Sequence, residues 1–235
     1  MKNKLLKFTA VFCALCIAGN IALCVKARKS VVYTGITDMT TTDAALVSNA
    51  HIQEAYVYSK NDESYYIQML EDECENNLEL LNSMDTILVV EPTGDMYQYR
   101  ASLEQQATVV DVVKCPDNLE NGDVIRIFRL MGFVYENGIA YCHFENIMYP
   151  GNRYLVFLDS SSVNEYTDSC DYIIGNAQMS YFKLDRSEGA LTCPSYDFAA
   201  CRDVLHFTSS AAIAEAISEY EELVIDKFYS LETEG

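Results

Sequence analysis

Seven short apolar runs rich in β-branched residues occupy the middle of the chain, and turn-forming residues separate them. The runs are Ile87–Val90, Ala107–Val113, Val124–Leu130, Ile139–Phe144, Tyr154–Leu158, Asp171–Ile174 and Met179–Leu184. Segments 92–95, 121–123, 136–138 and 150–152 each contain a glycine beside proline, asparagine or aspartate, residues that preset a turn or tolerate a positive φ. The pattern predicts antiparallel strands that close into a small barrel or pack as a sandwich, because such a sheet must hide its edges and its apolar face.

Apolar residues spaced three and four apart predict one helix before these strands and one after them. The apolar positions of the first are Ile67, Leu70, Cys74, Leu78 and Leu81. The second is capped by Ser209 or Ser210, and its apolar positions are Ile213, Ile217, Tyr220, Val224, Phe228 and Leu231. Its acidic positions, interpreted as a solvent-facing side rather than a strip of cation ligands, are Glu215, Glu219, Glu222 and Asp226. Strands and helices together predict an α+β domain that is mainly β.

The chain opens with an apolar stretch, Phe8 to Val25, that has basic residues on both sides. Eighteen residues of helix span roughly 27 Å at about 1.5 Å per residue, close to the thickness of a hydrocarbon core. Residues 5–25 are therefore predicted to cross a cell membrane once, with the C-terminal part extracytoplasmic. We divide the chain into an anchor or signal segment at 1–29, a stalk and lead-in at 30–61, and one β-rich domain at 62–235.

A cleaved signal peptide, and hence secretion, is the alternative to a retained anchor. Signal peptides have an apolar core of roughly 7 to 15 residues and a small-x-small cleavage site. The apolar stretch here is longer, and the large Leu23 before Cys24 also departs from a lipoprotein signal. The sequence therefore favours a retained anchor.

Net charge separates the anchor from the rest of the chain. Six of the 16 basic residues precede Ser30 and none of the 35 acidic residues does, which leaves ten basic residues and a balance of −25 in the remainder. Such a surface repels phosphate backbones and anionic lipid, so nucleic acid is excluded as a partner.

Six cysteines follow the anchor: Cys74, Cys115, Cys142, Cys170, Cys193 and Cys201. Outside the cytosol an even count permits three disulfides, in any of about 15 pairings, between which the sequence does not choose. Neither these cysteines nor His51, His143 and His206 show the spacing of a zinc or redox site. Structural or free thiols are the default, and we predict no metal and no cofactor.

Segments 85–90, 107–114, 121–127 and 148–158 together resemble bacterial extracytoplasmic domains with an OB-like barrel, similar to the netrin and tissue-inhibitor module. The resemblance covers about a hundred residues and implies a small closed antiparallel barrel, with a helix before its first strand and the amphipathic helix at the C-terminus. Cys115-Pro116 replaces a lysine-glycine turn of such domains, and the inhibitors' N-terminal cysteine wedge is missing, so inhibition is not carried over. The resemblance implies a binding or structural module.

The segment Met96-Tyr97-Gln98-Tyr99-Arg100 is the candidate ligand contact of such a module. In a loop after the first strand, its aromatic side chains would stack on a glycan or a peptide. As part of an extended strand, the tyrosines would instead form its solvent-facing side, and this interpretation is the stronger of the two.

A second resemblance is to sortases, anchored surface transpeptidases, and it lies in residues 190–206. Leu191-Thr192-Cys193 matches their active-site strand, and an arginine follows nine residues after the cysteine. The resemblance implies Cys193 as nucleophile, Arg202 as oxyanion stabiliser and His143 as the acid that protonates the leaving amine. However, no glycine-histidine pair surrounds His143, and Cys201 would compete for Cys193 by closing a disulfide loop.

We therefore predict a membrane-anchored extracytoplasmic binding or structural module whose ligand is a protein, a peptide or a glycan. No catalytic residue is assigned in this prediction. A sortase-like cysteine transpeptidase is the alternative.

Overall fold

The computed structural model describes residues 34–36, 50–52, 60–72, 74–99, 102–129, 134–136, 139–142, 145–164, 169–175, 179–184, 192, 198–201 and 204–229. The chain divides into two units, residues 1–33 and residues 34–235. The first unit lies outside the described residues, and with it the predicted membrane segment at 5–25. Among the helices that the structure describes, none is both long and apolar enough to cross a membrane.

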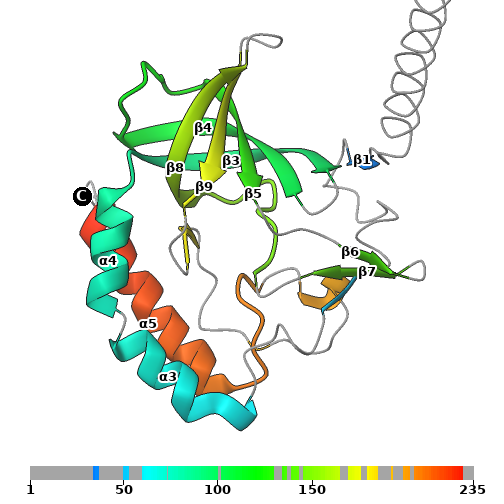
Figure 1. Ribbon diagram of the computed structural model, residues 1–235, viewed down its shortest axis with the longest axis vertical. Helices are drawn as coiled ribbons and strands as arrows, with labels where there is room; N and C mark the ends of the chain where they lie inside the picture. Colours follow the sequence, from blue (N-terminus) through cyan, green and yellow to red (C-terminus); the bar gives the residue numbers. More distant parts are fainter. Residues whose placement is uncertain are drawn as a thin grey trace, which may run out of the picture. The chain divides into compact units, whose positions relative to one another are not determined.

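Five strands of the second unit close into a barrel (Figure 1). In spatial order they are β3 (Thr86–Tyr99), β4 (Ser102–Lys114), β5 (Val124–Arg129), β9 (Ser169–Ile174) and β8 (Tyr154–Asn164), and β8 pairs back with β3. The mainly β class and the closed barrel are thus confirmed.

The barrel is mixed, so the predicted all-antiparallel arrangement is wrong. β3, β4 and β5 form an antiparallel meander, β8 is antiparallel to β3 and to β9, and β9 is therefore parallel to β5. A closed ring with an odd number of strands cannot alternate direction throughout, so one neighbouring pair must run parallel. Turn residues predict pairing only between strands that follow one another along the chain. They could not predict the parallel pair, because β5 and β9 are far apart in sequence.

Five short strands lie outside this ring. β1 (Thr34–Ile36) extends the sheet beside β3, and β10 (Tyr181–Lys183) pairs with the first residues of β8. β2 (Ala50–Ile52), β7 (Ile139–Cys142) and β6 (Val134–Glu136) form a separate three-stranded sheet. Each of the seven predicted runs contains strand residues, although the runs that contain β7 and β10 are not part of the five-stranded ring.

Within the described residues, two helices stand where the sequence predicted a single one: α3 (Glu63–Asp72) and α4 (Cys74–Ser83), after the short 3-10 helix η2 (Lys60–Asp62). The C-terminal helix α5 (Ala211–Phe228) agrees with its prediction as far as Phe228, and the predicted apolar position Leu231 lies outside the described residues. The Oγ atom of Ser210 caps it by accepting a hydrogen bond from the backbone N–H of Ile213. The predicted acidic side of α5 is exposed, as expected.

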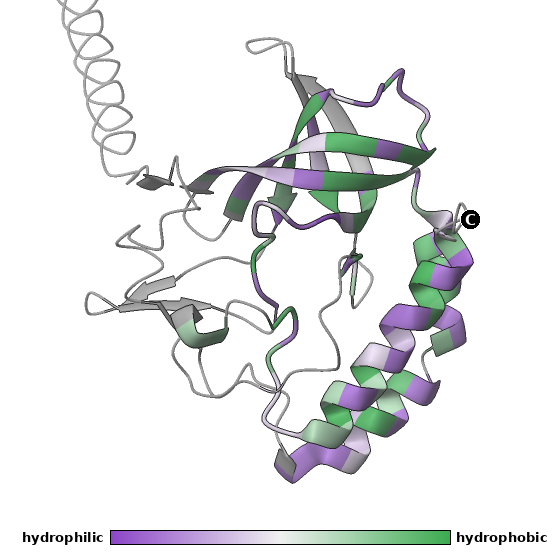
Figure 2. Ribbon diagram, turned by 180° about the vertical axis from the view of Figure 1, so that it is seen from behind, coloured by the Kyte–Doolittle hydropathy of each residue, from purple (hydrophilic) through white to green (hydrophobic). Residues whose placement is uncertain are grey.

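Both faces of several barrel strands are buried, in two separate clusters. Along β8, Tyr154, Val156 and Leu158 face the barrel interior. Leu155 and Phe157 face outward into a second cluster that α4 and α5 cover. The apolar stripes of these helices are seen in Figure 2. Because both faces are buried, the sequences of these strands are continuously apolar and do not alternate between apolar and polar residues.

Two of the four predicted turns are turns with glycine at positive φ, namely Gly122 and Gly151. Segment 136–138 lies where β6 and β7 pair as an antiparallel hairpin. The fourth prediction was wrong, because residues 92–95 continue β3. The register of β3 against β4 shifts between Pro92 and Met96, and Gly94 has a φ of 102° there. The chain uses this glycine for a bulge in a continuous strand.

Candidate functional site

The three residues of the transpeptidase alternative, His143, Cys193 and Arg202, lie outside the described residues. The structure therefore does not place them relative to one another. Cys74 and Cys115 are free thiols. Because three disulfides would need all six cysteines, that arrangement is not formed, and the default of free thiols fits these two. Among the described residues, no cluster of histidine, cysteine and acidic side chains is arranged to hold a metal ion.

The tyrosine segment that sequence analysis singled out belongs to strand β3, up to Tyr99. Met96 is buried, and Tyr97 is partly exposed. Tyr97 pairs with Glu104 of β4, and Tyr99 pairs with Ser102. The prediction of an extended strand is therefore confirmed, and the loop alternative is wrong.

Cross-strand partners project from the same side of a sheet, which places Tyr97 in a row with residues of three further strands. Tyr97 is opposite Glu104, Glu104 is opposite Phe128 of β5, and Phe128 is opposite Ile173 of β9. A neighbouring row joins Gln106, Arg126 and Asp171 on the same side. We call this outer surface of β3, β4, β5 and β9 the β-face; its residues are Tyr97, Glu104, Gln106, Val124, Arg126, Phe128, Asp171 and Ile173.

Apolar groups on the β-face remain open to solvent. Val124 is 50% exposed and Ile173 is 44% exposed, while Tyr97 and Phe128 are partly exposed. An exposed apolar group costs free energy in water, and several close together on one face are typical of a binding surface.

The charges of the β-face centre on Arg126. One guanidinium nitrogen lies 2.5 Å from a carboxylate oxygen of Asp171, and the other lies 3.9 Å from Glu104. The guanidinium carbon is 5.9 Å from the centre of the Phe128 ring. These two carboxylates and one guanidinium sum to a net negative charge, but Glu104 is buried, and the side chains of Arg126 and Asp171 are only 15% and 16% exposed.

The barrel interior is filled by side chains. Tyr154, Tyr172 and Tyr181 lie in it together with aliphatic residues. The hydroxyl of Tyr172 donates to the carboxylate of Asp117, and the hydroxyl of Tyr154 accepts from the backbone N–H of Tyr149. These side chains therefore pack the inside of the barrel as one core cluster.

Residues 145–149 cross one end of the barrel. Gln105, which points inward from β4, exchanges two hydrogen bonds with the backbone of Met148. Arg129, at the end of β5, donates to the carbonyl oxygen of Asn146 at 2.8 Å, and the hydroxyl of Tyr181 donates to the same oxygen. We call residues 145–149 the closing segment.

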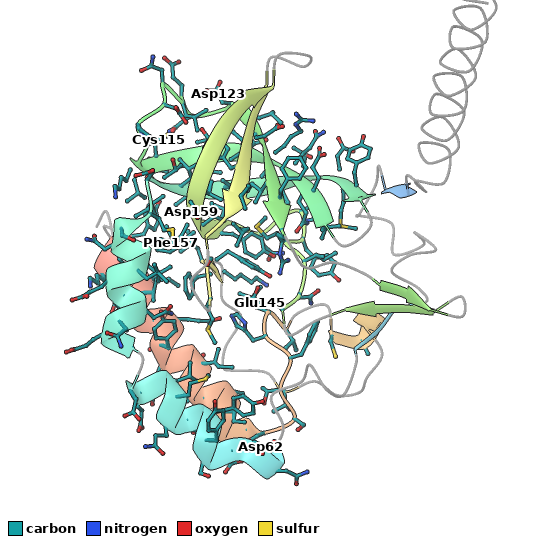
Figure 3. All side chains as sticks on the ribbon, viewed as in Figure 1. Asp62, Cys115, Asp123, Glu145, Phe157 and Asp159 are labelled. Carbon is teal, nitrogen blue, oxygen red and sulfur yellow. The ribbon has the colours of Figure 1, made fainter. Side chains whose placement is uncertain are left out.

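A buried ion cluster joins the closing segment to α5. Arg129 lies 3.1 Å from Glu145, and its guanidinium stacks 4.6 Å from the ring centre of Tyr181. Nδ1 of His206 lies 4.0 Å from Glu145, and Nε2 lies 3.1 Å from Glu221 of α5. Figure 3 shows Glu145 at this end of the barrel. The cluster therefore links β5, the closing segment, residues 204–208 and α5.

The electrostatics of this cluster favour a charged imidazole. Burial by itself lowers the pKa of His206, and Arg129 lowers it further. Contact with Glu221 and the charges of Glu221 and Glu145 outweigh them, so the pKa of His206 is raised above its ordinary value of 6.5. Burial also raises the pKa of Tyr181 well above 10, which keeps its hydroxyl protonated as a donor.

Sequence analysis missed the members of this cluster: Arg129, Glu145, His206 and Glu221. Glu221 belongs to a run of acidic residues on α5. Only the helical periodicity of the sequence could have indicated that its side chain lies near the buried side of the helix. Tyr220 and Val224 were recognised as buried, and Glu221 lies beside them on the edge of that side. No sequence signal singled out the other three.

Neither a scan against models of protein families nor a search of curated proteins finds a match to this chain.

Proposed function

We propose that this chain is a membrane-anchored extracytoplasmic module that binds oligosaccharides through the β-face of an OB-like barrel. The observation that carries the proposal is the row of Tyr97 and Phe128 beside the Asp171–Arg126 ion pair. This arrangement places partly exposed aromatic side chains beside an ion pair whose side chains keep 15% and 16% of their surface open to solvent.

The strand order supports the OB-like description. OB-folds are five-stranded Greek-key barrels, and in them the outer side of the second and third strands, with adjacent loops, binds oligonucleotides or oligosaccharides. In this barrel the second and third strands along the chain are β4 and β5, which form the centre of the β-face. The analogy with OB-folds indicates where a ligand would bind, and the residues at that position determine which class of ligand can bind.

Charge and sheet closure narrow the ligand class. A balance of −25 outside the anchor and a net negative β-face disfavour an oligonucleotide. An extended peptide commonly binds by adding a strand to a free sheet edge, but the β-face lies across neighbouring strands that already pair with one another. A sugar can place its C–H groups over aromatic rings and donate its hydroxyls to carboxylates, and it needs no sheet edge.

Replacing Tyr97 or Phe128 by alanine is expected to weaken oligosaccharide binding about two- to tenfold, which corresponds to the roughly 0.5–1.5 kcal/mol of one aromatic contact. The measurement is calorimetric titration of the full-length chain with cellohexaose and with chitohexaose, after both have been screened on an array with other neutral oligosaccharides. Tyr65→Ala is the matched control, because Tyr65 is an exposed tyrosine on α3. Absence of any oligosaccharide binding, or equal losses in all three variants, would contradict the proposal.

The anchor is tested separately. In bacterial cells that express the full chain, the protein is expected in the membrane pellet, because residues 5–25 are apolar enough to span it. Protease added to spheroplasts should remove the β-rich part while a cytoplasmic marker stays intact. Recovery of the full-length chain in the soluble interior would contradict the anchor and the extracytoplasmic location together.

A further inference from the structure

We propose that Glu145, His206 and Glu221 form a proton-controlled latch that holds helix α5 against the closing segment of the barrel. The three side chains come from different parts of the fold: the closing segment, the extended residues before α5, and the third turn of α5. His206 also forms a backbone β-bridge with Glu145, so its position beside the closing segment is fixed independently of its charge.

The latch depends on having one carboxylate at each ring nitrogen of His206. An imidazolium has an N–H at both nitrogens and can face two carboxylates, whereas a neutral imidazole has one N–H and one lone pair. Both ring nitrogens are buried and neither makes a hydrogen bond of good geometry, so their contacts with the two carboxylates are charge contacts, at 4.0 Å for Glu145 and 3.1 Å for Glu221. Loss of the proton therefore leaves Glu145 or Glu221 facing a lone pair.

Charge balance gives the same result. Among the described residues, the charged groups that act on His206 are Glu145, Glu221 and Arg129 of β5. Protonated His206 gives two positive charges against two negative ones. Deprotonated His206 leaves two carboxylates with one guanidinium, which already lies 3.1 Å from Glu145. Glu221 then loses the positive charge that faces it from His206 at 3.1 Å, so the attachment of α5 weakens.

The direction of the pH dependence follows from the raised pKa of His206. A group with a higher pKa in the folded state contributes stability that is fully present below its unfolded pKa, about 6.5. That contribution is lost as pH rises through the folded pKa. The latch is therefore closed at mildly acidic pH and opens above it.

Hydrogen exchange on the full-length chain tests the latch. Between pH 6.0 and pH 8.0, and after correction for intrinsic exchange, the opening equilibrium of α5 amides should rise up to about tenfold for each unit by which the pKa is raised. Amides of β8 should change less. Glu221→Gln should remove the pH response of α5, and Glu219→Gln, an exposed position on the same helix, should retain it.

Two results would overturn the latch. One is an equal pH response of α5 in the Glu221→Gln and Glu219→Gln variants. The other is a titration of the His206 imidazole below pH 6.5 by NMR of the unaltered chain, a measurement that does not depend on any variant folding. Neither result bears on oligosaccharide binding, because the β-face contains none of these residues.

Discussion

Replacing Phe157 by alanine is expected to lower the free energy of unfolding by about 3–5 kcal/mol, the range for a fully buried phenylalanine. Phe157 lies on the outer side of β8 and has no exposed surface. Its ring packs edge-on against Phe182 at 5.8 Å and against Phe228 of α5 at 5.0 Å. The substitution therefore removes contacts that join the barrel to β10 and to the C-terminal helix.

Urea denaturation of the full-length chain, followed by tyrosine fluorescence and circular dichroism, measures this loss, since the sequence contains no tryptophan. Val113→Ala is the control, because Val113 is 38% exposed on β4. We expect a change below about 0.5 kcal/mol for that surface position. A loss below about 1 kcal/mol for Phe157→Ala would mean that the barrel and α5 are not packed as described.

Replacing Arg129 by methionine is expected to cost about 3–5 kcal/mol, because it leaves the largely buried carboxylate of Glu145 with only the more distant His206, at 4.0 Å, as a positive partner. Arg129 is 5% exposed, and its guanidinium also donates to the carbonyl oxygen of Asn146. Methionine retains much of the aliphatic volume, so most of the loss is electrostatic. The free energy of unfolding in urea is again the measurement.

A double variant separates the charge effect from the loss of packing. Glu145→Gln removes the uncompensated charge with little change of shape, so Arg129→Met combined with Glu145→Gln should be more stable than Arg129→Met alone. Losses that simply add would show that Arg129 does not act through Glu145. His206 retains Glu221 as its carboxylate partner in the double variant.

Turn chemistry and apolar runs predicted most of the secondary structure. Gly122 and Gly151 lie in the turns where the sequence placed them, and Ser210 caps α5 as predicted. These features depend on a few neighbouring residues, so local sequence is enough to recognise them. Gly94 shows the limit of such reasoning, because a glycine at positive φ serves a bulge as well as it serves a turn.

The tyrosines show a similar limit at the level of packing. Sequence analysis considered only the tyrosines of residues 96–100 as ligand contacts and assigned no role to Tyr154, Tyr172 and Tyr181, which fill the barrel interior. A buried tyrosine is tolerated where its hydroxyl finds a partner, and these hydroxyls reach the barrel end or a loop. Tyr97, in contrast, lies on the outer surface, and its place there became evident only from its register against Glu104.

By itself, the sequence determined the mainly β class, the positions of seven strands and the amphipathic C-terminal helix, because each depends on periodicity within one segment. Tertiary structure decided the parallel pairing of β5 with β9, the membership of the β-face, and the cluster of Arg129, Glu145, His206 and Glu221. The physical reason is distance along the chain. Ion pairs and strand neighbours are selected by closure of the barrel and by charge compensation in its buried end, and neither leaves a periodic signal in the residues that take part.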